Sequence, residues 1–109
     1  MGLVTSSAST NNHNLYFSKD ELAKILNLYS KGVSSGEWKD YAIDFNKNNA
    51  FFYIFKHSLA SPECILNKSL EKKKRKIFYN LTSKNQKRKF DNLDLLLSSL
   101  NRKIFKILD

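Results

Sequence analysis

Residues 36–55 of the chain read GEWKDYAIDFNKNNAFFYIF and predict a β-hairpin. The first half alternates apolar and polar side chains, as one strand face requires, and its apolar positions are Tyr41, Ile43 and Phe45. The Asn-rich segment 46–49 has the composition of a turn, because Asn tolerates positive φ and hydrogen-bonds its own backbone. The second half is apolar on both faces, with Phe51, Tyr53 and Phe55 on one face and Phe52 and Ile54 on the other. We therefore expect the second strand to lie inside a sheet and not at its edge.

A helix is predicted before this hairpin. Ser18 and Glu21 have the spacing of a capping box, in which each side chain accepts a hydrogen bond from the other residue's amide. The apolar stripe that follows has helical spacing and consists of Leu22, Ile25, Leu26, Tyr29 and Val33. Either Gly32 or the segment 34–36 is expected to end this helix.

A second helix is predicted at the other end of the sequence. Asp91 or Asn92 is expected to cap it, because short polar side chains accept from the free amides of a first turn. Its apolar stripe consists of Leu93, Leu96, Leu97, Leu100, Ile104, Ile107 and Leu108. Leu95 and Phe105 fall outside this stripe.

The segment between the hairpin and the last helix predicts further short strands at 64–67, 77–82 and 87–90. The predicted fold class is therefore α+β, with an N-terminal helix, an antiparallel sheet of four or five strands and a C-terminal helix, in two layers. Residues 1–14 are rich in Ser, Thr and Asn and are expected to form a disordered tail. Residues 15–109 are expected to form a single domain.

Composition limits the class of protein. The chain has 109 residues, of which 41% are hydrophobic and 13% aromatic, so it has enough apolar surface for one modest core. Cys64 is the only cysteine, which excludes an internal disulfide and favours a reducing compartment. No apolar run approaches the length of a membrane span, so we expect a cytoplasmic protein that makes no contact with a membrane.

The net charge of +9 comes from one segment, residues 68–89, which contains ten basic residues and one acid. Such an asymmetry favours an anionic partner, and the best candidate is RNA or DNA bound without sequence preference. The candidate contact residues are Lys72, Lys73, Lys74, Arg75, Lys76, Lys87, Arg88 and Lys89. They flank the 77–82 strand and are expected to converge on one edge, with stacking from Phe78 and Tyr79. The alternative interpretation is a solvated, charged edge strand that prevents pairing between sheets.

A different function is a protein-interaction or homodimerising adaptor that uses Leu95, Phe105 and the aromatic hairpin. An enzyme is not expected, and neither are a cofactor, a metal or a small-molecule substrate. Glu37, Asp40 and Asp44 come from one short segment, whereas a metal site draws ligands from several elements, so a metal site is not expected there. Glu37 and Asp40 are expected to cap or salt-bridge the turn. The only cysteine-nucleophile pairing is Cys64 with His57, and Cys64 lies in an apolar strand.

Several motifs resemble those of a small, chiefly alphaproteobacterial family known as domain of unknown function 2794. The first helix ends in Ile25-Leu26-Asn27-Leu28-Tyr29, residues 36–45 match the family's block with Lys39 in place of Arg, and Ala50-Phe51-Phe52 follows. The resemblance is good from about 17 to 55 and thins after Pro62, where Lys89 stands in place of an expected Gly. The signature residues are Gly36, Glu37, Trp38, Asp40, Tyr41, Ile43, Asp44 and Phe45. The resemblance implies no activity, so we expect these residues to be structural, with Gly36 in the turn and Trp38 in the core.

Overall fold

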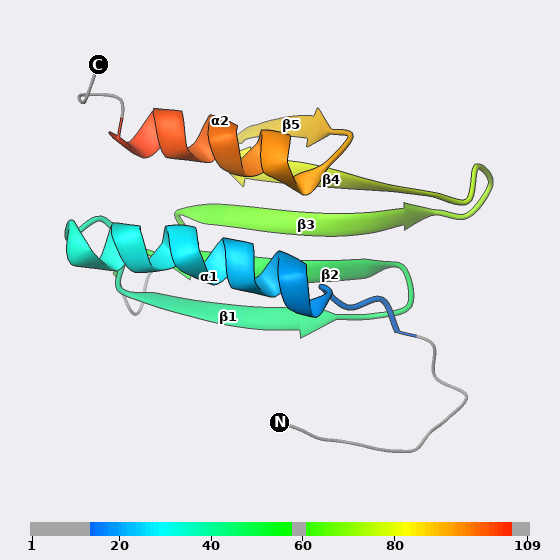
Figure 1. Cartoon of the computed structure of the whole chain (residues 1–109), viewed down its shortest axis with the longest axis horizontal. Helices are drawn as coiled ribbons and strands as arrows, with labels where there is room; N and C mark the ends of the chain where they lie inside the picture. Colours follow the sequence, from blue (N-terminus) through cyan, green and yellow to red (C-terminus); the bar gives the residue numbers. More distant parts are fainter. Residues whose placement is uncertain (1–13, 58–60, 106–109) are drawn as a thin grey trace.

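The computed structural model describes residues 14–57 and 61–105, so nearly all of the expected tail lies outside the described residues. Its elements are α1 (Lys19–Ser34), β1 (Asp40–Phe45), β2 (Asn49–Phe55), β3 (Cys64–Glu71), β4 (Lys76–Ser83), β5 (Gln86–Phe90) and α2 (Leu93–Phe105). The strands form one antiparallel sheet in the order β1-β2-β3-β4-β5, and both helices lie on the same face of it (Figure 1). The predicted α+β class, element order and two layers are confirmed, with five strands in the sheet.

The core lies between the helices and one face of the sheet. Residues directly opposite each other on antiparallel strands share a face. Phe52 on β2 is paired with Leu66 on β3, and Leu66 with Leu81 on β4. All three are at most 3% exposed and pack with the buried residues of both helices. The interior position predicted for β2 is confirmed, because β1 and β3 flank it.

The opposite face of the sheet has no helix over it in the part of the chain that the structure describes (Figure 1). We call it the uncovered face. By strand register it displays Asp40, Ala42, Asp44, Asn49, Phe51, Tyr53, Phe55, Ile65, Asn67, Ser69, Glu71, Lys76, Phe78, Asn80, Thr82, Lys87 and Lys89. The rings of Phe51 and Tyr53 stack along β2, with centroids 5.8 Å apart. The helices therefore leave an aromatic surface in the middle of the sheet.

Helix α1 begins at the predicted capping box and ends at Ser34, two residues before Gly36. Both hydrogen bonds of the Ser18–Glu21 capping box are present. Gly32 does not end the helix but is buried within it, because the indole of Trp38 packs directly over its backbone. Gly36 follows the helix with φ +82°, a conformation that favours glycine.

The buried face of α1 differs by one position from the predicted stripe. Leu28 is 8% exposed and belongs to the core, whereas Val33, which we predicted to be buried, is 44% exposed. Helical spacing alone places both residues near the boundary of an apolar face. Leu28 lies one turn before Gly32, on the face of the helix that Trp38 covers, whereas Val33 lies to one side of that face.

Helix α2 is capped by Asn92, whose side-chain oxygen accepts from the Leu95 amide at 2.9 Å. The Leu95 side chain is 53% exposed, in agreement with its place off the predicted stripe. Phe105 is different, because it packs against the core and is only partly exposed. The predicted stripe positions Ile107 and Leu108 lie outside the described residues.

Strands β3 and β4 are longer than predicted and form a hairpin that projects from the sheet. The pairing of β2 with β3 stops at Ser69, and that of β4 with β5 stops at Tyr79. Beyond these points β3 and β4 pair with each other up to Glu71 and Lys76, although the Leu70 amide also donates to the Asn48 carbonyl at 2.9 Å. We call residues 70–77 the basic arm, which extends past the neighbouring strands in Figure 1. Sequence reasoning missed its strand pairs because polar residues interrupt the apolar alternation there.

Candidate nucleic-acid interface

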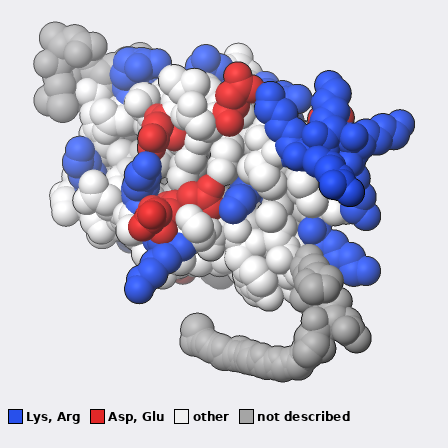
Figure 2. Space-filling view, turned by 45° about the vertical axis from the view of Figure 1, so that its right-hand side comes forward, with Lys and Arg blue, Asp and Glu red and all other residues white. Residues whose placement is uncertain are grey.

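The tip of the basic arm carries five consecutive bases: Lys72, Lys73, Lys74, Arg75 and Lys76. All five are exposed, and Figure 2 shows Lys and Arg side chains densely grouped at one end of the molecule. Arg75 has φ +50° and its amide donates to the Lys72 carbonyl, which closes the turn. Among the described residues, the only ion pair at this tip joins Lys76 to Asp91 at 4.0 Å. The tip therefore presents four positive charges to solvent without a paired acid in the described chain.

The three bases of β5 do not join the arm in one patch, so the predicted convergence on one edge is wrong. Lys87 and Lys89 are paired with Thr82 and Asn80, six and four residues along β4 from Lys76, which corresponds to about 20 and 13 Å of strand. Arg88 lies on the helix-covered face, where its guanidinium donates to the Ser99 hydroxyl at 2.9 Å. Only Lys87 and Lys89 lie on the uncovered face, at the edge of the sheet.

The two aromatic residues predicted to stack on bases have different environments. Tyr79 is 9% exposed, and its hydroxyl donates to the Glu21 carboxylate, so its ring is not available to a ligand. Phe78 lies on the uncovered face, and the Lys89 ammonium is 4.1 Å from the centroid of its ring. The predicted role of Tyr79 in stacking is therefore wrong.

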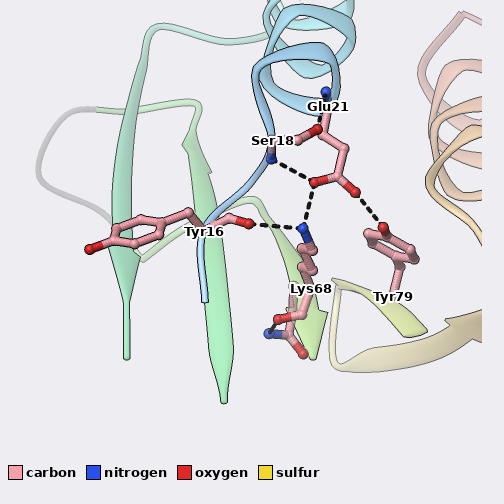
Figure 3. A network of polar contacts seen from close by, with 6 residues as sticks. Tyr16, Ser18, Glu21, Lys68 and Tyr79 are labelled. Carbon is pink, nitrogen blue, oxygen red and sulfur yellow. Dashed lines mark hydrogen bonds and ion pairs between the residues drawn. The ribbon is translucent and has the colours of Figure 1, made fainter. Parts of the chain in front are cut away.

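Sequence reasoning missed a polar network beneath the start of α1 (Figure 3). The Lys68 ammonium is 2.8 Å from the Glu21 carboxylate and also donates to the Tyr16 carbonyl at 2.8 Å. The carboxylate accepts from the Tyr79 hydroxyl and from the Ser18 amide. The Lys68 and Glu21 side chains are only 12% and 17% exposed. Lys68, one of the ten bases in the segment 68–89, is thus a structural residue.

Burial raises the pKa of both acids of this network, whereas hydrogen bonding lowers the pKa of Glu21 and raises that of Tyr79. Burial raises the pKa of Glu21, but the hydrogen bonds from Lys68, Tyr79 and the Ser18 amide outweigh it and hold the pKa below its ordinary value. The pKa of Tyr79 is raised above its ordinary value, mainly by burial and to a smaller extent by the hydrogen bond to the Glu21 carboxylate. The network therefore keeps an ionised Glu21 beside a neutral Tyr79, and it ties α1 to β3 and β4.

The signature residues have structural positions. Trp38 is 2% exposed in the core, as predicted. Tyr41, Ile43 and Phe45 share one strand face as predicted. This is the helix-covered face, but each residue is 40–41% exposed because β1 is the edge of the sheet.

The two aspartates of the signature cap backbone amides of the edge strand. Asp40 accepts from the Tyr41 amide and Asp44 from the Phe45 amide, each at 2.8 Å. The four-residue spacing puts both carboxylates on the same side of β1, where they occupy backbone donors that an additional strand would need.

The described residues contain no group of three or more His, Cys, Asp and Glu side chains placed to hold a metal ion. Cys64 is 1% exposed, and burial is the largest cause that raises its pKa to about 11, whereas His57 is exposed. A thiol with this pKa is almost entirely protonated at neutral pH and is a weak nucleophile.

Comparisons with known proteins place the chain in a family without assigning it an activity. Among the described residues, no helix is both long and apolar enough to span a membrane. No curated protein and no solved structure matched the chain. A family model matched residues 15–94, which include α1 and all five strands, so the similarity extends well beyond the 17–55 region that carries the signature. With most of its length matched, the chain belongs to the family described as protein of unknown function (DUF2794).

Proposed function

We propose that this protein is a small, non-enzymatic module that binds nucleic acid through its basic arm and without strong sequence preference. The observation that carries the proposal is the arm itself, a projecting hairpin with five consecutive exposed bases at its tip. Phosphate contacts by Lys and Arg supply most of the affinity in non-specific binding. We place this function in the cytoplasm, where a single unpaired cysteine stays reduced.

The arm supports this function better than the β5 bases do, because the β5 bases have a structural explanation. β5 is an edge strand, and lysines on an edge prevent pairing with another sheet. Arg88 is held by Ser99 and covers Phe90, with its guanidinium carbon 5.1 Å from that ring centroid. The tip of the arm has no comparable structural explanation. A turn does not need four adjacent positive charges, and the charges of Lys72, Lys73, Lys74 and Arg75 repel one another.

The experiment compares two variants from which the same charge has been removed. The arm variant carries Lys72→Ser, Lys73→Ser and Lys74→Ser, and the control carries the same substitutions at the exposed Lys19, Lys31 and Lys103. Binding of labelled RNA and duplex DNA oligonucleotides of mixed sequence is measured by fluorescence anisotropy over a range of salt concentrations.

The wild type should bind more weakly as salt rises, because phosphate contacts release counterions. In the arm variant, the magnitude of the slope of log K against log salt concentration should fall by about 2 to 3. The control should retain most of the wild-type slope. Equal losses in the two variants would show that net charge, not the arm, attracts the ligand. Absence of binding by the wild type at low salt would reject the function.

A further inference from the structure

The uncovered face combines an apolar centre with edges of opposite charge. Its centre is built from Phe51, Tyr53 and Phe55 on β2, Ile65 on β3 and Phe78 on β4. The β1 edge contributes two acids, Asp40 and Asp44, and the β5 edge two bases, Lys87 and Lys89. An apolar centre within a charged rim is the composition of a protein–protein interface.

The same face is a poor site for a polyanion. By register it carries three acids and three bases, since Glu71 is paired with Lys76 in addition to the four edge residues. The excess positive charge of the protein therefore lies elsewhere, and its densest part is Lys72, Lys73, Lys74 and Arg75 at the arm tip. The acids lie beside the aromatic strand β2, where a phosphate backbone laid on those rings would be repelled.

We infer that the uncovered face binds a second copy of this chain, face to face, with the two-fold axis parallel to the strands. Two identical sheets can stack in aligned packing about an axis parallel or perpendicular to their strands. The perpendicular axis puts β1 on β1 and β5 on β5, so like charges meet. The parallel axis puts β1 of each copy opposite β5 of the other, so acids meet bases.

The strand register fixes which residues meet. One continuous cross-strand row runs through Asp44, Phe51, Asn67, Asn80 and Lys89. Rotation about an axis parallel to the strands keeps the row at its level and exchanges its ends, so Asp44 lies opposite Lys89 of the second copy. In the next row Lys87 comes opposite Ala42, between the two aspartates.

The polar residues in the middle of the row are already hydrogen-bonded within the sheet. The Asn80 amide donates to the Asn67 oxygen at 3.0 Å, and the Asn67 amide donates to the Asn49 oxygen at 3.2 Å. Covering these side chains therefore leaves few polar groups without a partner, which is the main cost of burying a polar row. The Lys89 ammonium lies over Phe78 and so on the face itself, where it can meet an acid of the second copy.

The symmetry also determines where the arms lie. An axis parallel to the strands leaves both arms at the same end of the dimer, about 10 Å apart, the usual distance between stacked sheets. Their like charges oppose association at low salt. Removing arm charge with the Lys72→Ser, Lys73→Ser, Lys74→Ser variant is therefore expected to tighten the dimer at low salt.

The test measures the oligomeric state of the full chain by sedimentation equilibrium, without nucleic acid. A concentration-dependent dimer is expected. Asp44→Lys and Lys89→Asp should each weaken it about tenfold, because two symmetry-related rim pairs turn from attraction to repulsion. The double variant should restore the wild-type constant, because both pairs then form with reversed sign.

A second pair of variants locates the interface. Tyr53→Glu at the centre of the face should abolish the dimer while leaving the unfolding curve of the monomer nearly unchanged, and Leu95→Glu on the exposed side of α2 should have no effect on association. A monomer at every concentration would overturn the inference. So would a double charge variant no tighter than the single ones, or a dimer that Leu95→Glu disrupts. A monomer whose nucleic-acid affinity falls with Tyr53→Glu would instead assign the face to nucleic acid.

Discussion

Replacing Gly32 with alanine should destabilise this protein, although alanine is the better helix former. A Cβ at position 32 would lie 2.1, 2.5 and 2.7 Å from three carbons of the Trp38 ring. The shortest of these distances is about 1.3 Å less than the 3.4 Å at which van der Waals contact is ordinary. Trp38 is 2% exposed and its ring lies parallel to that of Tyr29, with centroids 6.2 Å apart, so it has little room to move.

The magnitude follows from two opposing effects. Alanine gains about 1 kcal/mol over glycine in helix propensity. Overpacking a closed core costs about 1–3 kcal/mol, and three clashing ring atoms place this site near the upper end. The expected net loss in the free energy of unfolding is about 2 kcal/mol, which lowers Tm by about 10 °C in a domain of this size.

A double-mutant cycle measured by urea unfolding separates this clash from a general intolerance of Gly32. In the Trp38→Leu background, Gly32→Ala should be neutral or stabilise by up to about 1 kcal/mol, because the ring is gone. Gly36→Ala is the matched control: it meets nothing within 4 Å but has φ +82°, so it should cost about 1–2 kcal/mol in both backgrounds. If Gly32→Ala costs the same with and without the Trp38 ring, the packing explanation is refuted.

Three further predictions concern polar groups with structural roles. Glu21→Gln should cost about 3 kcal/mol at neutral pH, because it leaves the Lys68 ammonium buried without its carboxylate. Because the pKa of Glu21 is lowered in the folded state, its contribution to the free energy of unfolding is complete above the ordinary value of 4.5 and is lost as pH falls through the folded-state pKa. Urea unfolding at several pH values should therefore show the stabilities of wild type and variant converging in acid. A difference in stability that does not change with pH would contradict this. The Cys64 thiol, with a pKa of about 11, should react with a disulfide reagent at least about a hundredfold more slowly in the folded than in the unfolded protein, and equal rates would refute its burial. Arg88→Ser should lower stability by about 1 kcal/mol through loss of the Ser99 hydrogen bond and leave nucleic-acid affinity unchanged, and a loss of affinity comparable to that of the arm variant would contradict its placement.

The sequence was sufficient to predict the elements whose signals are local. The capping box at Ser18 and the aromatic hairpin were predicted, and the cap of the last helix was narrowed to Asp91 or Asn92, because each depends on residues within a few positions of one another. The alternation of strands also contained a signal that was not used: Arg88 must face opposite to Lys87 and Lys89, so the three bases of β5 could not form one surface.

Other features depend on contacts between distant segments and could not be predicted from local patterns. Lys68 and Glu21 are 47 residues apart, and only the register of β3 under α1 brings them together. Gly32 was interpreted as a possible helix end because local patterns give no reason for a glycine inside a helix. The reason is its contact with Trp38, which follows the helix in the sequence. The uncovered face follows from the placement of both helices on one side of the sheet, and strand spacing alone does not determine which side a helix covers.

The two interfaces proposed for this chain are compatible because the charges of the sheet are divided among its edges and its arm. Asp40 and Asp44 occupy outward amides on the β1 edge, and lysines line the β5 edge, so neither edge readily accepts another strand. Association of two copies is then confined to the uncovered face, where the same edge charges favour the arrangement that pairs β1 with β5. That arrangement leaves the tips of both basic arms at one end of the dimer, free to contact phosphates. A nucleic acid bound by both arms would screen the repulsion between them, so RNA or DNA should increase the dimer fraction of the wild type more than that of the variant whose arm charge is removed. Equal increases in the two proteins would show that the arms do not link association to nucleic-acid binding.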